Sequence, residues 1–170
     1  MNYIFKSSRE TKQFGKLFSY LLIRIPPRKK RARVIGISGD LGAGKTTFVQ
    51  GFITAIIPRA KVTSPTFLIA RVYPLLARKK HIYKNIYHLD LYRITHIKEL
   101  QTIGFEEMIA NPYNIVLIEW PEKAKNIMLK TDIYMKFSHI KNEKERALLI
   151  TTKEKKITTL LKKSDLEGKV

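Results

Sequence analysis

The chain has 170 residues, enough to bury the core of one α/β-sized domain but few for two. A hydrophobic content of 44% is ordinary for a globular protein and argues against disorder, and the absence of cysteine excludes disulfides and thiolate metal sites. No apolar run approaches the roughly 18 residues of a membrane span, and the N-terminus lacks a signal-peptide layout, so we expect a cytoplasmic protein without a membrane partner.

The charge of the chain is its unusual feature. There are 33 Lys and Arg residues against 14 Asp and Glu residues, a formal net charge of +19. A basic surface attracts phosphates, which favours a polyanionic partner such as a nucleic acid. The alternative is a general lysine bias, because lysines occur in nearly every segment. The charge therefore supports a link to nucleic acid without showing direct binding.

The first two predicted elements are a helix and a basic loop. Residues 7–22 favour an amphipathic helix, because Ser7 and Glu10 form a capping-box pair and apolar residues then recur at helical spacing. Pro26–Arg31 breaks the chain with two prolines and four cations. We interpret it as a solvated loop; a nucleic-acid or nuclear-localisation patch is the alternative.

A strand, a glycine loop and a helix are predicted next. Val34–Ser38 is a short apolar run that suits a buried strand. The loop Gly39–Thr46 (GDLGAGKT) follows it, and the apolar stripe of residues 48–57 predicts a helix that Pro58 ends.

The middle of the chain alternates between strand and helix signals. Phe67–Tyr73 and Ile82–Tyr92 are rich in β-branched and aromatic residues and are predicted to be strands. A short helix is predicted over His96–Ile103, with Gly104 ending it. Ile115–Ile118 is a continuous apolar run, typical of a strand buried on both faces.

The last part of the chain predicts two strands and a tail. Ile133–Ser138 and Arg146–Thr151 alternate and are predicted to be antiparallel strands near an edge. We assign residues 1–152 to one P-loop domain and residues 153–170 to a lysine-rich tail that forms a frayed helix. The fold class is α/β, with a mainly parallel central sheet, helices on both faces and antiparallel edge strands.

The loop Gly39–Thr46 carries the full Walker A pattern G-x-x-x-x-G-K-T. Its glycines let backbone N–H groups wrap a β-phosphate, and the following helix directs its positive end at the nucleotide. Lys45 supplies charge for the β- and γ-phosphates, and Thr46 offers a hydroxyl to Mg²⁺. An ordinary glycine-rich turn is the alternative. The reaction expected here is in-line attack of water on the γ-phosphate.

Two acidic residues accompany the loop. Glu119 follows the apolar run 115–118, at the strand end where open α/β sheets bind ligands, and would reach Mg²⁺ directly or through water, or polarise the attacking water. Asp90 shares a strand face with His88 and Tyr92 if the strand persists, and is a candidate for holding the metal's water or the nucleophilic water. A surface carboxylate and a structural histidine are the respective alternatives.

Three further observations bear on the nucleotide. Thr63–Phe67 places hydroxyls around a proline and suits a switch-like loop, with an ordinary capped turn as the alternative. Arg93 would neutralise phosphate charge or form a salt bridge elsewhere. The guanine-reading motif Asn-Lys-x-Asp does not occur, which favours ATP over GTP.

These motifs, in this order, closely resemble the TsaE (YjeE) family, the bacterial P-loop ATPases of tRNA threonylcarbamoyladenosine biosynthesis. The matching motifs are Gly39–Thr47 (GDLGAGKTT), Ser64–Phe67 (SPTF), His88–Arg93 (HLDLYR) and Glu119–Pro121 (EWP). The resemblance extends over residues 7–150, and Gly15 and the stretch Glu99–Gly104 also fit it.

The resemblance implies an ATPase that helps install threonylcarbamoyl on the adenosine next to the anticodon in tRNAs reading ANN codons. It implies that the chain acts with the TsaB–TsaD pair and does not transfer the group itself, ATP hydrolysis resetting the assembly between turnovers. ATP and Mg²⁺ are the implied cofactors. tRNA is at least an indirect partner, and no DNA partner is expected.

The resemblance also implies roles for individual residues. The residues implied to bind the phosphates are Gly42, Ala43, Gly44, Lys45, Thr46 and Thr47. Thr46 and Glu119 would ligate Mg²⁺, and the implied catalytic residues are Asp90, Glu119 and Lys45. Thr66 would belong to a switch near the γ-phosphate, and Ser8 and Thr11 would lie near the adenine. Arg146 resembles a basic residue that the family has late in its sequence, and its role is unassigned.

The chain departs from the family pattern in its basic segments. The Pro26–Arg33 linker and the Lys79–Lys84 stretch are longer and more basic than the family usually shows, and the tail after residue 152 has no clear counterpart. These departures leave the nucleotide motifs intact and affect inferences about partner surfaces.

Two other functions stay open on the sequence alone. A small-molecule phosphotransferase would use the same loop but would need an acceptor pocket and usually an arginine-rich lid, and no arginine-dense lid segment occurs. A basic tRNA-binding module with a vestigial P-loop predicts steeply salt-dependent tRNA binding that Lys45→Ala leaves intact.

Overall fold

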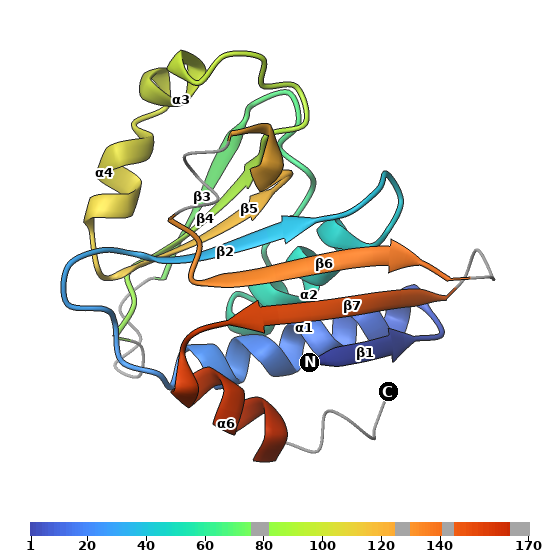
Figure 1. Cartoon of the computed structure of the whole chain (residues 1–170). Helices are drawn as coiled ribbons and strands as arrows, with labels where there is room; N and C mark the ends of the chain where they lie inside the picture. The colour runs from blue at the N-terminus through green and yellow to red at the C-terminus, as the bar shows by residue number, and fades with distance from the viewer. Residues whose placement is uncertain (76–81, 125–129, 141–144, 164–170) are drawn as a thin grey trace.

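The computed structural model describes residues 1–75, 82–124, 130–140 and 145–163. Within these residues, seven strands form one sheet in the order β1-β7-β6-β2-β5-β4-β3 (Figure 1). The strands are β1 (Asn2–Phe5), β2 (Arg33–Ser38), β3 (Ala70–Pro74), β4 (Asn85–Asp90), β5 (Asn114–Glu119), β6 (Ile133–His139) and β7 (Arg146–Thr152).

The central strands β6, β2, β5 and β4 run parallel, while β7 and β1 on one side and β3 on the other add antiparallel pairs. Every residue of β2 and β5 is buried. Strands covered on both faces show continuous apolar runs, which is why the sequence predicts these two correctly. The expectation of a mainly parallel sheet with antiparallel strands towards its edges is confirmed.

Helices cover both faces of the sheet and complete three layers (Figure 1). On one face α1 (Ser8–Leu22), α2 (Lys45–Ile56) and α6 (Lys155–Lys163) contribute to a large apolar cluster. On the other face α3 (Lys98–Thr102) and α4 (Phe105–Ala110) contribute to a smaller one. A short 3-10 helix, η1 (Pro121–Lys123), follows β5. Among the described residues, no helix is long and apolar enough to cross a membrane.

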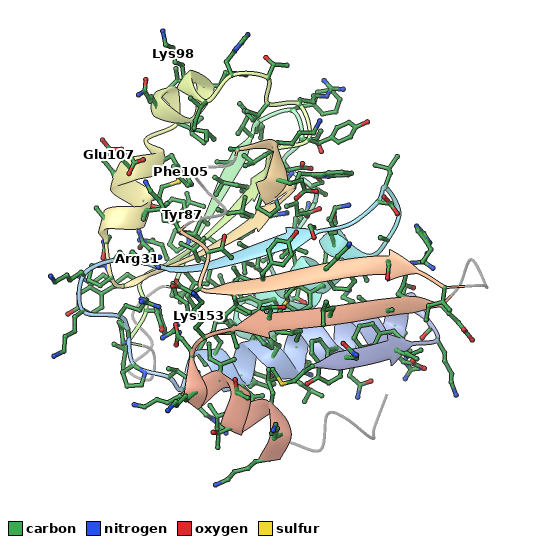
Figure 2. All side chains as sticks on the ribbon, viewed as in Figure 1. Arg31, Tyr87, Lys98, Phe105, Glu107 and Lys153 are labelled. Carbon is green, nitrogen blue, oxygen red and sulfur yellow. The ribbon has the colours of Figure 1, made fainter. Side chains whose placement is uncertain are left out.

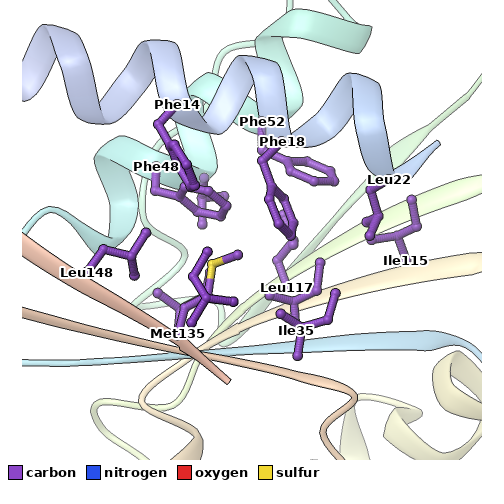
Figure 3. Close-up of a cluster of buried hydrophobic side chains, with 14 of the residues drawn as sticks. Phe14, Phe18, Leu22, Ile35, Phe48, Phe52, Ile115, Leu117, Met135 and Leu148 are labelled. Carbon is purple, nitrogen blue, oxygen red and sulfur yellow. The ribbon is translucent and has the colours of Figure 1, made fainter. Parts of the chain in front are cut away.

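α1 and α2 pack against each other through glycines and phenylalanines. A Cβ atom added at Gly51 would lie 2.0 Å from the Lys12 carbonyl oxygen, and one at Gly15 would lie 2.3 Å from the Phe48 carbonyl oxygen, so only glycine permits this approach. Beneath the helices lie four buried rings (Figure 3), those of Phe14, Phe18, Phe48 and Phe52. Burying each ring stabilises the fold by about 1.5–3 kcal/mol. The helix that follows the glycine loop is therefore fixed against α1.

The predicted cap of α1 forms with one change. The Ser7 hydroxyl accepts a hydrogen bond from the Glu10 backbone N–H at 3.2 Å, as a capping box requires. Glu10 Oε2 accepts from the backbone N–H of Lys6 at 2.7 Å, one residue before the position that the motif predicts.

Several predicted boundaries in the first half are wrong. The strand predicted from Phe67 begins at Ala70, because Phe67 and Leu68 lie in an exposed turn. The strand predicted over Ile82–Tyr92 is confined to β4. Edge strand β1 is missing from the prediction, since its pairing partner β7 is distant in the sequence.

The second half shows similar differences. The helix predicted over His96–Ile103 is the shorter α3, and Gly104, with φ of 68°, also starts α4, which the sequence analysis missed. The strands predicted at 133–138 and 146–151 pair antiparallel with each other, as expected, but the first of them also lies beside central β2 and parallel to it, two strands in from the edge. Helix α6 occupies part of the tail assigned to 153–170. Residues 79–81 of the basic stretch Lys79–Lys84, and residues 164–170 of that tail, lie outside the described residues.

Candidate functional site

The glycine loop leaves the carboxyl end of β2 and enters α2. Gly39 and Gly42 have φ of 132° and 74°, in the region that favours glycine. A Cβ atom at Gly39 would also lie 2.2 Å from the Phe137 carbonyl oxygen on β6. The loop conformation therefore depends on glycine, as the Walker A pattern predicts.

The carboxyl ends of β4 and β5 meet the same loop. Asp90 and Glu119 are register partners on the two parallel strands. The Leu91 N–H donates to the Glu119 carbonyl at 3.0 Å, and the Trp120 N–H donates to the Ile37 carbonyl at 3.0 Å. The chain turns away immediately at Trp120, whose φ is 58°. Two acidic side chains thus face a loop that is distant from both in the sequence.

A cavity of about 300 Å³ lies where these ends meet. Eight of the predicted site residues line it: Gly42, Gly44, Lys45, Thr46, Thr47, Thr66, Asp90 and Glu119. Ala43 is fully buried beneath the loop and does not line the cavity. Lining residues that the sequence analysis did not assign to the site are Leu41, Ser64, Tyr92 and Trp120.

Lys45 is held inside the loop. Its Nζ donates to the carbonyl oxygens of Gly39 at 2.7 Å and Asp40 at 2.8 Å. It also lies 4.1 Å from the centre of the Trp120 ring, a cation–π distance. Burial lowers the pKa of Lys45 below its ordinary value, while the nearby carboxylates, Glu119 foremost, act in the opposite direction. The ammonium group thus lies at the cavity, and its hydrogen-bond acceptors in the described part of the chain are two carbonyls that a ligand can replace.

Glu119 accepts hydrogen bonds from two side chains on other elements. Thr46 Oγ1 donates to Glu119 Oε2 at 2.9 Å, and His88 Nε2 lies 2.8 Å from Glu119 Oε1. Because a carboxylate only accepts, Nε2 of His88 carries the proton in this contact. His88 is fully buried, and among the described residues its Nδ1 has no hydrogen-bond partner. The hydroxyl and carboxylate predicted to share a metal are adjacent, and the histidine orients the carboxylate.

Asp90 connects the strand end to the switch-like segment. Its Oδ2 accepts from Ser64 Oγ, and from Thr66 Oγ1 at 2.6 Å. Its Oδ1 accepts from the Tyr92 backbone N–H at 3.0 Å. His88 and Asp90 share a strand face as predicted, since both side chains reach this cavity region, but Tyr92 lies beyond the end of β4. The hydroxyls of residues 64 and 66 therefore lie at the cavity wall.

Other predicted residues lie beside the cavity. Ser8 is exposed at the start of α1, whereas Thr11 is buried, with its methyl group 3.5 Å from where a Cβ atom at Gly44 would lie. Arg146 Nε donates to the Gly42 carbonyl at 3.3 Å. Arg93 packs on the Phe67 ring at 4.2 Å and does not line the cavity. The adenine contact expected of Ser8 and Thr11 stays a prediction.

The donors at this site suit phosphates and a hard cation. Backbone N–H groups of a glycine loop at a helix N-terminus form an anion site. In the described residues no group of three or more His, Cys, Asp or Glu side chains could hold a metal, but the Thr46 hydroxyl and the Glu119 carboxylate lie together beside the loop. Mg²⁺ favours this kind of site, since it takes its other ligands from water and substrate phosphates.

The His88–Glu119 contact and the role of Trp120 were missed by the sequence analysis. The contact joins β4 to β5, so no local pattern shows it. The available signal was the period of two, which puts His88 on the same face as Asp90 and next to the strand that ends at Glu119. Trp120 belongs to the EWP motif, but the sequence analysis assigned it no role at the cavity.

Comparisons with known proteins agree on one family. A family model described as "Threonylcarbamoyl adenosine biosynthesis protein TsaE" matches residues 5–148. The tRNA threonylcarbamoyladenosine biosynthesis protein TsaE of Haemophilus influenzae is 34% identical over 140 residues, which are 82% of this chain and 83% of that protein. Proteins of the same name are 35% identical in Rickettsia typhi (81% and 86% covered) and 32% identical in Borreliella burgdorferi (76% and 85% covered).

A solved structure supports the fold separately. The crystal structure of YdiB from Bacillus subtilis matches with a TM-score of 0.69 and covers 97% of this chain and 95% of that chain. The two sequences are 21% identical, so this likeness concerns the three-layer α/β architecture.

Proposed function

The chain belongs to the TsaE family of tRNA threonylcarbamoyladenosine biosynthesis, and we propose that it serves that pathway as an Mg²⁺-dependent ATPase acting with a TsaB–TsaD pair. The observation that carries this proposal is one cavity lined by the glycine loop, Lys45, the Thr46–Glu119 pair and Asp90. The proposed role is that of an accessory protein whose ATP hydrolysis resets the assembly while the transfer itself occurs elsewhere.

The loop and Lys45 bind the triphosphate in this proposal. Phosphate oxygens replace the carbonyls of Gly39 and Asp40 as acceptors for Lys45 Nζ, which now lies 2.7 and 2.8 Å from them. Burial lowers the pKa of Lys45, and the phosphate charge favours the ammonium form again. Lys45 and the loop N–H groups then face the charge that develops on the γ-phosphate in the transition state.

Thr46 and Glu119 are the residues that hold the cation. Their oxygens are 2.9 Å apart, and a hydroxyl with a carboxylate is the donor set that Mg²⁺ prefers. When bound, Mg²⁺ supplies positive charge against the β- and γ-phosphate oxygens. His88 holds Glu119 in place through Nε2, as outer residues orient metal ligands in other proteins.

Asp90 orients the attacking water. It is 4% exposed and already accepts two hydroxyl hydrogen bonds, from Ser64 and Thr66. Rotation of either hydroxyl frees an acceptor position at the cavity, which a water molecule can take. Thr66 then contacts the nucleotide side of the cavity, in the manner of a switch threonine.

ATP turnover measured with and without purified TsaB–TsaD tests this proposal. We expect the isolated chain to hydrolyse ATP well below the roughly 1–100 s⁻¹ typical of kinases, and the pair to raise the rate. Glu119→Ala should lower the stimulated rate about 100-fold or more, whereas Glu122→Ala, an exposed carboxylate three residues on, serves as the matched control and should not.

Three outcomes would count against the proposal. Fast turnover by the isolated chain would contradict the partner dependence. A lack of stimulation by the pair would contradict the assigned role while leaving nucleotide binding intact. ATP-dependent phosphorylation of a metabolite would favour the phosphotransferase alternative.

A further inference from the structure

A second cavity lies at the opposite end of the sheet from the glycine loop. Its volume is about 700 Å³, larger than that of the nucleotide cavity. Six cationic side chains line it, together with one carboxylate, that of Glu154. The cations are Arg28, Lys29, Lys30, Arg31, Arg33 and Lys156. We name this surface the linker face, because most of it belongs to the segment 26–33 that joins α1 to β2.

The linker face is separate from the nucleotide cavity. It surrounds the amino end of β2, whereas the glycine loop leaves the carboxyl end. β2 has six residues, which at about 3.3 Å each separates the two sites by roughly 17 Å. Figure 2 shows Arg31 and Lys153 at this end of the molecule, near the start of α6. The two cavities therefore have no lining residue in common.

Ion pairs hold the linker in a fixed shape. Arg28 and Arg31 both bind Asp132 Oδ1 at 2.6 Å, and Arg28 also binds Glu154 Oε1 at 2.9 Å. Arg33 is buried, pairs with Glu154 and donates to the Pro26 carbonyl at 3.0 Å. Pro26–Arg31 is a loop ahead of β2, as predicted, and its two arginines anchor it through these ion pairs.

The lysines of the linker face have a different environment. Lys29, Lys30 and Lys156 are exposed, and none forms an ion pair with an acidic residue in the described part of the chain. Lys153 and Lys155 are exposed near Lys156 on the chain. The anchored arginines thus present a cluster of lysines whose charges stay available to a ligand.

The chemistry of this face fits a phosphodiester backbone. Lysine ammonium groups on flexible stems bind phosphates as point charges, and several together displace counterions from a polyanion. A membrane surface would also need apolar side chains that insert among lipids. In the described residues, none of the exposed large hydrophobic side chains lines this cavity. The family works on tRNA, which makes RNA the polyanion at hand.

We propose that the linker face binds the phosphodiester backbone of tRNA directly, with Lys29, Lys30 and Lys156 as the contacting cations. This surface is independent of the proposed ATPase activity, because none of its residues lines the nucleotide cavity. It also explains part of the +19 net charge by a cluster of lysines on one surface, whereas composition alone cannot distinguish such a cluster from a general lysine bias.

Binding of fluorescent tRNA by the full chain tests this proposal, measured by anisotropy between about 50 and 200 mM salt. The variant K29E/K30E/K156E should bind tRNA about tenfold more weakly. A plot of the logarithm of the association constant against the logarithm of the salt concentration has a negative slope, and this slope should become shallower by about 2 for three lost phosphate contacts. The neutral variant K29Q/K30Q/K156Q should weaken binding in the same direction by less. ATP turnover and the unfolding midpoint should match those of the parent chain.

The matched control is K12E/K16E/K98E, which changes the net charge equally at exposed lysines on α1 and α3. Its tRNA affinity should fall less than threefold. An equal loss in both triple variants would overturn the proposal in favour of diffuse charge. Absence of tRNA binding by the parent chain at low salt would also overturn it. So would lost binding to phosphatidylglycerol vesicles with tRNA binding unchanged, since that points to a membrane.

Discussion

The two ends of the central strands hold their carboxylates with different donors. At the carboxyl end, Glu119 and Asp90 accept hydrogen bonds from hydroxyls, an imidazole and a backbone N–H, none of which needs to carry charge. At the amino end, Asp132 and Glu154 accept from arginines. Uncharged donors satisfy a buried carboxylate without neutralising it, whereas arginines neutralise it. The carboxylates at the carboxyl end therefore keep a negative charge that can bind a cation, whereas those at the amino end are neutralised by arginines and stabilise the fold.

This comparison predicts that substitutions at the carboxyl end change activity and that substitutions at the amino end change stability. The largest effect is expected for Asp90→Asn. Asparagine can keep the Tyr92 N–H bond through its oxygen and donate to the hydroxyls of Ser64 and Thr66, so the fold is preserved. ATP turnover should fall about 100-fold or more, because the carboxylate that orients the attacking water is lost. Turnover assays measure the effect on activity, and urea unfolding measures the effect on stability. A loss of stability above about 1 kcal/mol would contradict the view that the carboxyl end serves activity alone.

Asp132→Asn should show the reverse behaviour. The side chain is 3% exposed, binds two arginines and accepts the Val34 N–H at 2.9 Å. An amide NH₂ group would face arginine donors, and we expect a loss of about 2 kcal/mol, lowered by the partial exposure of the arginines. Urea unfolding measures it. ATP turnover per folded molecule should be unchanged, and Glu107→Gln, at an exposed carboxylate on α4 that does not line the nucleotide cavity, is a control for the change from carboxylate to amide.

His88→Ala tests how the carboxyl end keeps Glu119 in place. Removing the Nε2 contact leaves Glu119 with only the Thr46 hydroxyl, so the carboxylate is less well oriented for a cation. Loss of such an orienting partner weakens metal-dependent activity by about 10- to 100-fold. The Mg²⁺ concentration that gives half-maximal ATP turnover should rise. A lower rate at an unchanged Mg²⁺ requirement would contradict the proposal that His88 orients Glu119 for the cation.

The smallest effect is expected for Tyr83→Phe at the amino end. The buried Tyr83 hydroxyl donates to the Ile25 carbonyl at 3.0 Å and accepts from Arg33 Nε at 3.2 Å. Removing it should lower the free energy of unfolding by about 1 kcal/mol, because the ring remains and two hydrogen bonds are lost. Chemical unfolding measures the change. Unaltered ATP turnover would sharpen the division between the two ends.

The sequence predicts best what is determined locally. The strand–loop–helix unit at 34–57 and the strand at 115–118 are correct, because burial on both faces and the glycine loop leave local patterns. β1 and α4 are missed: one is a short strand paired with β7, and the other begins at the glycine that seemed to end a helix. Tertiary contacts decided both.

The site shows the same limit. The motifs and the family resemblance together predict which residues meet a nucleotide, and eight of these residues line one cavity. They cannot predict that His88 binds Glu119, or that Ser64 and Thr66 bind Asp90, since these contacts join separate elements. The burial of Arg33 in a basic segment was also hidden, because its partner Glu154 lies beyond the last strand.

The pairing of β1 with β7 has a consequence for biosynthesis. Residues 2–5 leave the ribosome before their hydrogen-bonding partners at 146–149, which emerge more than 140 residues later. β2 precedes the glycine loop, and it likewise cannot pair on its two sides until β5 and β6 have been synthesised. Such long-range pairing slows folding and leaves apolar edges exposed meanwhile. The nascent chain therefore contains the complete Walker A motif well before the strands that position this loop in the sheet have been synthesised.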